Sequence, residues 1–540
     1  MSLQGKDQEP DNGEVITAPE LPKPPGLLRS SAVVGVMTML SRVLGLLRDV
    51  VFARFIGAEA GADAFFVAFK IPNFLRRLFA EGAFAQAFVP VLSEYRAQGS
   101  VAAVRGLLDR VAGCLGLTLT LLTALAMIGA PVLTAVFAPG FLNDPVRFPL
   151  ASDMIRITFP YLLLISMTGF AGAILNSYDR FAVPAFTPVL LNVALISSAV
   201  LAAPYFDPPV MALAWGVLAA GVIQLLFQLP FLVRLGLMPR PKVDWQDDGV
   251  KRILGLMAPA IFGVSVSQIN LLLDTVLASF LPTGSVSWLY YSDRLAELPL
   301  GVFAIAIATV ILPGLSRQNA SEDPLKFSQT LDWAVKTVLL IALPAAVALI
   351  ILAQPILTTL FQYGKTLPED IAMSTLSLRA YALGLVAFML IKVLAPGYYA
   401  RQDMKTPVKI GVIAMVSNMV LNLVFVLPFY FLWNIGHVGL ALATSASAFI
   451  NMGLLWRGLS RQGVYRSVSP WGRVILQLLV ANLAMAVALL WVMSRLTGWA
   501  DWLWSERVVA LALLCVTGLV VYGSVLLAAG MRLRDFRGAH

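Results

Sequence analysis

Residues 41–95 of this chain read SRVLGLLRDVVFARFIGAEAGADAFFVAFKIPNFLRRLFAEGAFAQAFVPVLSEY. Ten charged residues fall between Arg42 and Glu81, inside what otherwise reads as two membrane helices. Six of them are basic and four are acidic, which leaves a surplus of two positive charges. Ionisable groups at bilayer depth are costly and usually face a water-filled cavity on a substrate path. The stretch therefore predicts a polar cavity that suits an anion.

The composition places the chain among helical membrane proteins. Of its 540 residues, 59% are hydrophobic and 13% are charged, whereas soluble domains carry about 25% charged residues. The two cysteines lie in apolar runs and the two histidines lie far apart, so the sequence offers no disulfide framework or metal-binding cluster. The basic excess is typical of cytoplasmic loops, and we expect no nucleic-acid binding. Without a nucleophile–base pair or a DxD-type cluster, we expect a transporter rather than an enzyme.

Apolar segments recur after residue 27 with short polar breaks, and they predict about fourteen transmembrane helices in an all-α polytopic fold. The predicted spans are 28–56, 62–94, 103–137, 150–176, 184–203, 208–234, 250–281, 286–316, 326–362, 371–400, 406–430, 437–458, 472–494 and 506–531. Residues 1–27 are polar, acidic and proline-bearing, which predicts a disordered cytoplasmic tail rather than a cleaved signal peptide.

The basic residues predict the orientation, because cytoplasmic loops carry the Lys and Arg excess of a membrane protein. One set of loops, together with the C-terminal tail, holds twenty Lys and Arg residues. The opposite set holds only four, which are Arg147, Lys365, Arg495 and Arg507. We therefore expect both termini in the cytoplasm.

A faint internal repeat relates the two halves of the chain. AQAFVPVLSEY (85–95) matches ATVILPGLSRQ (308–318), and YDRFAVPAFTPV (178–189) matches YYARQDMKTPV (398–408). Both pairs are offset by about 220 residues, or six helices, as in transporters whose two lobes share an orientation. The alternative is that these apolar segments resemble each other by chance. We expect a tail at 1–27, an N-lobe at 28–235, a C-lobe at 236–462, and two further helices with a tail at 463–540.

The first charged helix offers candidate phosphate ligands. Arg42 and Asp49 are seven residues apart, which places them on one helix face about 10 Å apart along the axis. A guanidinium binds two phosphate oxygens and stays charged when partly desolvated, so Arg42 and Arg48 suit an anionic ligand. Asp49 would hold a neighbouring arginine while no ligand is bound. The alternative is an ion-pair network that only fixes helix packing.

The second charged helix adds Arg76 and the i,i+4 pair of Arg77 and Glu81. Because Arg76 is outside this pair, it is the better candidate ligand. Lys70 or Arg77 would alternatively snorkel toward an interface. Pro72 within the pattern predicts a kink near the middle of the membrane.

The second half of the chain contributes two further polar groups. If the repeat holds, Arg294 faces the same cavity from across the lobe interface, while Asp293 and Glu297 offer it a local ion-pair alternative. The other group consists of Asp274, Asn418, Asn422 and Thr444. Its oxygen atoms suit a small monovalent cation or a proton relay, whereas plain interhelical hydrogen bonding is the alternative.

Several of these segments closely resemble the MurJ (MviN) lipid II flippases of bacteria. They are MTMLSRVLGLLRDVVFARFIG (37–57), DAFFVAFKIPNFLRRLFAEGAFAQAFVPVLSEY (63–95), GSVSWLYYSDRLAELP (284–299) and VLAPGYYARQDMKTPVKI (393–410). The resemblance covers nearly all of the chain from residue 28. It implies the fold of the multidrug/oligosaccharidyl-lipid/polysaccharide exporter superfamily, with two six-helix lobes and a lipid-tail groove at the last two helices. It also implies that undecaprenyl-diphosphate carrying the disaccharide-pentapeptide moves from the cytoplasmic to the periplasmic leaflet.

The resemblance also assigns roles to residues. The arginines carried over as essential are Arg42, Arg48, Arg76 and Arg294. Their acidic partners carried over from the family, which would re-pair with them when the lipid leaves, are Asp49, Asp63 and Glu81. Glu297, close to Arg294 in the sequence, is a further candidate acidic partner. Some family members bind sodium between helices 7, 11 and 12, and Asp274, Asn418 and Thr444 fit that pattern. Asn422 stands where those members carry an aspartate, so sodium, protons and the membrane potential all stay open as energy sources.

The expected partners are lipid II, membrane lipids and cell-wall synthesis proteins. The only expected cofactor is a coupling sodium ion or proton. Two rival functions remain at this point. A drug or cation exporter of the same superfamily would need an acidic or aromatic cavity, which the positive surplus disfavours. A non-transporting lipid-binding scaffold of cell-wall assembly is the other alternative.

Overall fold

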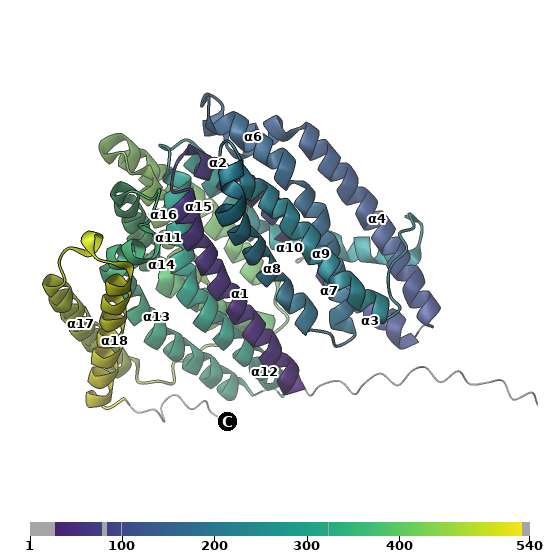
Figure 1. Ribbon diagram of the computed structural model, residues 1–540. Helices are drawn as coiled ribbons and strands as arrows, with labels where there is room; N and C mark the ends of the chain where they lie inside the picture. The colour runs from purple at the N-terminus through teal and green to yellow at the C-terminus, as the bar shows by residue number, and fades with distance from the viewer. Residues whose placement is uncertain (1–26, 78–83, 99, 322, 532–540) are drawn as a thin grey trace, which may run out of the picture.

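A computed structural model describes residues 27–77, 84–98, 100–321 and 323–531 (Figure 1). Glu81 and nearly all of the predicted N-terminal tail lie outside these described residues. Every regular element among the described residues is a helix, which confirms the all-α fold class.

The helices follow the predicted apolar segments closely. In the first half they are α1 (Leu27–Phe55), α2 (Ala60–Leu75), α3 (Ala85–Gln98), α4 (Val101–Ile128), α5 (Ala130–Phe137), α6 (Arg147–Thr158), α7 (Pro160–Ser177), α8 (Ala182–Ser197) and α9 (Met211–Arg234). In the second half they are α10 (Asp248–Ser279), α11 (Ser285–Pro299), α12 (Ile305–Ala320), α13 (Pro324–Phe361), α14 (Pro368–Tyr399), α15 (Lys405–Trp433), α16 (Gly436–Arg461), α17 (Trp471–Arg495) and α18 (Trp504–Ala528). Short helical turns join some of them: η2 (Pro139–Phe141), η3 (Ser198–Ala202), η4 (Ala203–Tyr205), η5 (Leu300–Ala304) and η6 (Trp499–Asp501).

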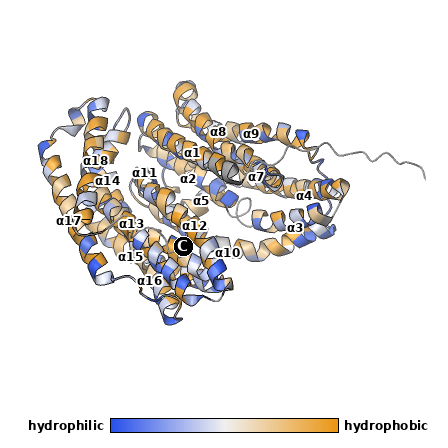
Figure 2. Ribbon diagram, turned by 90° about the horizontal axis from the view of Figure 1, so that it is seen from below, coloured by the Kyte–Doolittle hydropathy of each residue, from blue (hydrophilic) through white to orange (hydrophobic). Residues whose placement is uncertain are grey.

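Eleven stretches of the described residues are long and apolar enough to cross a membrane. Figure 2 shows the corresponding helices as mainly hydrophobic along their lengths. This confirms a polytopic membrane protein. α1, the α2–α3 pair and α10 are not among the eleven, and these helices hold many of the charged residues of the predicted cavity. The number of fourteen spans therefore stays a prediction.

Several predicted spans are interrupted within the membrane region. The span predicted at 150–176 divides into α6 and α7 before Pro160, which lacks the N–H that a continuous helix needs. In the span predicted at 62–94, α2 ends at Leu75, residues 76–77 form a π-helical turn, and α3 begins at Ala85. In the second half, α11 is followed by the π-helical turn η5 before α12 begins. π-Helical turns often mark functional sites, and here both halves carry one after a charged helix.

The helices form two lobes, and we call α1–α9 the N-lobe and α10–α16 the C-lobe. In the N-lobe, α1 packs on α8, and α9 packs on both α7 and α8. In the C-lobe, α14 and α16 pack together, with α13 beside α14 and α15 beside α16. α10 contacts α3, α4 and α5 of the N-lobe as well as α15 of its own lobe. The lobe boundaries at 235 and 462 stay predictions.

The last two helices form an appendage. α17 and α18 pack against each other and against α13, and both views place them at the edge opposite α4 (Figures 1 and 2). α1 begins and α18 ends at the lower side of the molecule in Figure 1. The start of α1 and the end of α18 thus lie on the same side of the molecule. The assignment of that side to the cytoplasm stays a prediction.

Candidate functional site

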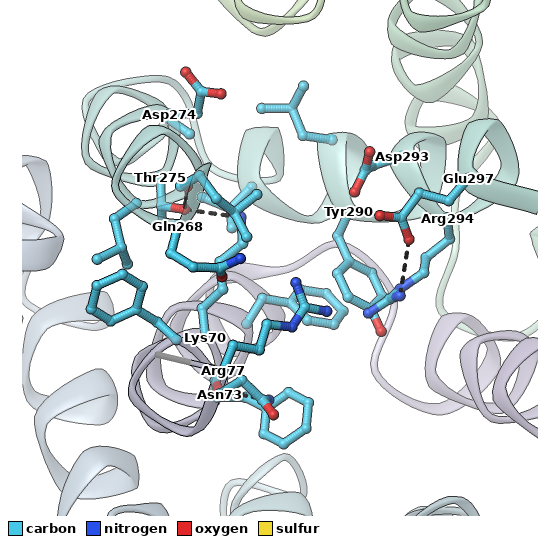
Figure 3. Close-up of a pocket in the computed structure, with 18 of the residues that line it drawn as sticks. Lys70, Asn73, Arg77, Gln268, Asp274, Thr275, Tyr290, Asp293, Arg294 and Glu297 are labelled. Atoms are coloured by element: carbon cyan, nitrogen blue, oxygen red, sulfur yellow. Dashed lines mark hydrogen bonds and ion pairs between the residues drawn. The ribbon is translucent and has the colours of Figure 1, made fainter. Parts of the chain in front are cut away.

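A polar cavity of about 270 Å³ lies between the lobes, and we call it the central cavity (Figure 3). Its charged lining comprises Arg48, Lys70, Arg76, Arg77 and Arg294 with Asp274, Asp293 and Glu297. Five basic and three acidic side chains leave a surplus of two positive charges. The lining comes chiefly from α2, α10 and α11, with contributions from α1, α8, α14 and α16. The structure thus gathers at one place the charges that the sequence distributes over both halves.

A second cavity, of about 530 Å³, adjoins the first, and we call it the side cavity. α1 and α8 of the N-lobe and the end of α11 line it. Arg48, Arg294 and Glu297 line both cavities. Arg42 lines only the side cavity, where its guanidinium lies directly over Gly301 of η5, so a side chain at position 301 would displace it. The arginines of α1 therefore face the C-lobe across a lateral space.

Arg48 is held by a dense hydrogen-bond network. Its side chain is buried and donates two bonds to the Asp49 carboxylate, at 3.0 and 2.8 Å. It also donates to Asn192 Oδ1 on α8 and to the Tyr290 hydroxyl on α11, each at 3.0 Å. The Tyr290 hydroxyl in turn donates to Asp49 at 2.9 Å. In this conformation Arg48 and Asp49 form the ion-pair network that the sequence left as the alternative.

Arg294 is held much more loosely. Its Nε lies 3.9 Å from Asp49 Oδ2, and its Nη1 lies 3.4 Å from Glu297 Oε2. The guanidinium stacks over the Tyr290 ring, 5.0 Å from the ring centre. Its side chain is 36% exposed, and that of Glu297 is 51% exposed. Arg294 is thus the cavity arginine of the C-lobe, and it faces the α1 network as the repeat predicts.

The basic side chains of α2 reach the cavity from the other lobe. Lys70 donates to Thr275 Oγ1 on α10 at 2.9 Å, and Arg76 donates to Asn73 Oδ1 at 3.2 Å. In Figure 3, Arg77 and Arg294 reach into the cavity from opposite sides. The predicted partner of Arg77, Glu81, lies outside the described residues. The cavity therefore presents basic groups from both lobes to one space.

The predicted cation group assembles beside the central cavity. Asp274 Oδ1 accepts hydrogen bonds from Asn418 at 3.0 Å and Asn422 at 2.9 Å. Thr444 Oγ1 lies 3.5 Å from Asp274 Oδ2. Asn418 also donates to Asn270 Oδ1, a neighbour that the sequence reasoning missed. Within the described part of the chain, the Oδ1 atoms of Asn418 and Asn422 are buried without a hydrogen-bond partner. A cluster with unused buried oxygens fits a small cation or a proton.

One end of the lobe interface is closed by hydrogen bonds, and we call it the sealed end. Asp63 on α2 is fully buried and accepts bonds from Gly284 N at 2.7 Å, Ser287 N at 3.0 Å and Ser287 Oγ at 2.6 Å. Its carboxylate therefore caps the N-terminus of α11 across the interface. Arg147 lies 3.9 Å from Asp63. Asp63 lines neither cavity, so the structure does not bring it to the predicted arginines.

The segment 362–367 after α13 completes the sealed end. Lys365 N donates to Arg54 O at 3.0 Å, and Thr366 Oγ1 donates to Ala53 O at 2.7 Å, both at the end of α1. Gly57 adopts φ +69° against Lys365, where a side chain would strike the backbone. At the opposite end, α10 contacts α3 and α4 of the N-lobe, with an ion pair of Glu94 and Arg252 at 2.7 Å.

Two residues of the α1 network escaped the sequence reasoning. Tyr290 bonds both Arg48 and Asp49 and stacks under Arg294, and its one signal was an aromatic residue four positions before Arg294. Asn192 also donates to Ser41 O at 3.0 Å, so it ties α8 to α1. The sequence feature that could have pointed to Asn192 is an asparagine within an otherwise apolar helix.

Comparison with known proteins places the chain in a family. The family described as "Lipid II flippase MurJ" matches residues 52–509. A Vibrio cholerae protein named probable lipid II flippase MurJ is 51% identical over 520 residues, which cover 95% of this chain and 98% of that protein. A Burkholderia cenocepacia protein named lipid II flippase MurJ is 41% identical over 520 residues, which cover 95% and 99%.

Solved structures give the same result. One described as "Lipid II flippase MurJ, inward closed conformation" is similar with a TM-score of 0.76 and 28% identity, over 92% of this chain and 98% of that chain. An inward-facing multidrug transporter of the MATE family has a TM-score of 0.65 and 15% identity, over 81% of this chain and all of its own, and shows a shared fold alone. Because the family match and both relatives span most of the sequence, this chain belongs to the MurJ family of lipid II flippases.

Proposed function

We propose that this chain moves lipid II from the cytoplasmic to the periplasmic leaflet of the bacterial inner membrane. Its family is one of flippases, and the relatives that match nearly its whole length carry the name lipid II flippase MurJ. The observation that carries the proposal is the central cavity. Basic side chains from both lobes surround it, with a surplus of two positive charges. A diphosphate is the part of lipid II that such a cavity would bind.

Arg294 makes the first contact with the diphosphate in this proposal. Its partners lie at 3.4 and 3.9 Å, so little is lost when a phosphate replaces them. Arg76 approaches the central cavity from the end of α2, and Arg42 faces the adjoining side cavity from α1. Arg48 binds the diphosphate only after phosphate oxygens replace Asp49 as the acceptor of its hydrogen bonds at 2.8 and 3.0 Å. Asp49 then recovers Arg48 when the lipid leaves, which resets the empty transporter.

The lobes must move apart for the substrate to enter. A volume of about 270 Å³ is small for a disaccharide-pentapeptide, because pockets for drug-sized ligands already measure about 300–1,000 Å³. With the basic loops in the cytoplasm, the sealed end faces the periplasm. Opening on the cytoplasmic side admits the headgroup. Closing that side and breaking the Asp63 bonds to α11 releases it outward. The lipid tail stays in the bilayer, where the resemblance places a groove at α17–α18.

A cation or proton at Asp274 is the proposed coupling group. Rotating the Asn418 and Asn422 amides would turn their buried oxygens toward the Asp274 carboxylate, which gives three side chains able to hold a small cation. The membrane potential adds about 2.3 kcal/mol per charge at 100 mV and favours export of an anionic lipid. Cell-wall synthesis proteins remain proposed partners on either side of the membrane.

A leaflet-resolved assay tests the function. Purified protein is placed in liposomes that contain lipid II, and an added headgroup-modifying enzyme reports the lipid that reaches the outer leaflet. We expect the parent to accelerate translocation and Arg294→Ala to slow it by about ten- to a hundredfold, because one charge-assisted contact is worth about 1.5–3 kcal/mol. Arg317→Ala is the matched control, since Arg317 is exposed and lines neither cavity.

The assay tests the flippase function and the role of Arg294 separately. If the parent moves lipid II no faster than protein-free liposomes, the flippase function is wrong. If the parent is active and Arg294→Ala matches it, the function stands and the diphosphate role of Arg294 is wrong. Transport of a small organic cation by the parent, without lipid II movement, would favour the exporter alternative.

A further inference from the structure

Arg507, at the start of α18, is a buried cation held by backbone carbonyls. Only 5% of it is exposed. It donates to Thr358 O at 3.2 Å, to Gln362 O at 3.3 Å and to Ala500 O at 2.7 Å. No ion pair joins it to a carboxylate of the described residues within salt-bridge distance. Burying a charge costs free energy, which these carbonyl contacts partly offset, whereas the Arg507 Nε is buried without a hydrogen-bond partner among the described residues.

Two of the three carbonyls belong to the end of α13. Thr358 lies in the last turn of α13, and Gln362 is its C-terminal cap. The carbonyls of a helix C-terminus carry partial negative charge, which a cation stabilises, and Thr358 O accepts the Arg507 bond in addition to one from Gln362 N at 3.3 Å. The guanidinium also stacks over the Tyr363 ring, 5.3 Å from its centre. From α18, Arg507 therefore binds two carbonyls at the C-terminal end of α13.

The same end of α13 continues into the segment that closes the sealed end. Tyr363 is followed by Lys365 and Thr366, which bond the end of α1 through Arg54 O and Ala53 O. Arg507 thus sits next to the segment that joins the C-lobe to the N-lobe. Along the rest of its length, α13 meets α17 and α18 through apolar contacts and one bond from the Tyr522 hydroxyl.

We infer that Arg507 is a positioning residue that couples the α17–α18 pair to the sealed end. When the pair is seated on α13, Arg507 fixes the end of α13 and the segment 362–367 in the closed position. When the pair shifts, the carbonyls lose their cation and the segment is released from α1. The inference concerns opening of the sealed end alone, so it does not depend on which lipid the cavity carries.

A thiol at Ala58 reports opening of the sealed end. Ala58 is 7% exposed and lies in the interface beside Gly284. The protein carries Ala58→Cys with Cys114→Ala and Cys515→Ser, and it is labelled in lipid nanodiscs with a bulky maleimide. We expect Arg507→Gln to raise the labelling rate by about tenfold or more, because two or three hydrogen bonds of the closed state are lost.

Two further variants separate coupling from general damage. Arg507→Lys keeps a cation at the carbonyls and should restore slow labelling. Arg495→Gln removes an exposed charge from α17 and should label like the parent. Labelling of folded Arg507→Gln at the parent rate would overturn the inference, as would equal acceleration by Arg507→Lys. If Arg507→Gln does not fold, Tyr363→Leu is measured instead; faster labelling supports the coupling, and an unchanged rate contradicts it.

Discussion

Asp63→Asn should open the sealed end. The Asp63 carboxylate accepts three hydrogen bonds from α11, at 2.6–3.0 Å, and is fully buried. Hydrogen bonds to a charged group are worth about 1.5–3 kcal/mol each. Asparagine keeps one acceptor oxygen but turns an N–H₂ group toward the donors of Gly284 or Ser287. A loss of about 3 kcal/mol would raise the ratio of open to closed molecules by roughly a hundredfold.

Spin labels on the two lobes measure this ratio. Asp207→Cys and Glu369→Cys place exposed labels near the sealed end, in a background that lacks both native cysteines. We expect a longer distance to appear in the Asp63→Asn protein at the expense of the parent distance. Asp153→Asn is the matched control, because its carboxylate is 54% exposed and pairs only with a neighbouring arginine. Identical distance distributions in Asp63→Asn and the parent would refute the reasoning.

Three further predictions concern other parts of the chain. In the parent, sodium should raise the thermal unfolding midpoint if Asp274 binds it, and Asp274→Asn should abolish that rise; an equal rise in both proteins would exclude the cluster as the sodium site. Tyr290→Phe removes one bond to Asp49 and one from Arg48, so it should destabilise the protein by about 1–2 kcal/mol, and an unchanged unfolding midpoint would argue against the network. Asp332→Asn removes a carboxylate that accepts four hydrogen bonds from residues 465–471, between α16 and the start of α17, so protease should cleave this segment faster. Cleavage at the parent rate would show that Asp332 does not anchor the segment.

The helices were largely predictable because long apolar runs alternate with short polar loops. Most predicted spans begin and end within a few residues of the observed helices, as at α13, predicted at 326–362 and observed at Pro324–Phe361. The interruptions were not predictable in the same way. A proline such as Pro160 signals a break, but the π-helical turn η5 depends on how α11 packs between the lobes. Local sequence carries little information about that packing.

The site was predictable in residue types and less so in partners. Asp274, Asn418, Asn422 and Thr444 come together as the family resemblance implied. Besides the adjacent Asp49, however, Arg48 bonds Asn192 and Tyr290, which are 144 and 242 positions away in the sequence. No local pattern joins residues so far apart, so the sequence could not separate a loosely held arginine from one already engaged in bonds.

The sealed end shows why acidic residues were the hardest to place. Asp63 has the residue type of an arginine partner, yet most of its contacts are with the backbone and a serine of α11. Backbone donors at a helix start exist in every sequence, and only the docking of α2 against α11 selects this one. The same holds for Arg507, whose acceptors are main-chain carbonyls at the end of α13.

The affinity of the purified protein for lipid II tests the central claim most directly. We expect Arg294→Ala to bind lipid II about ten- to a hundredfold more weakly than the parent, since a loosely paired cavity arginine loses its contact with the diphosphate. Arg317→Ala should bind like the parent. Equal affinities in Arg294→Ala and the parent, with both proteins folded, would contradict the claim that the central cavity binds the diphosphate through this arginine.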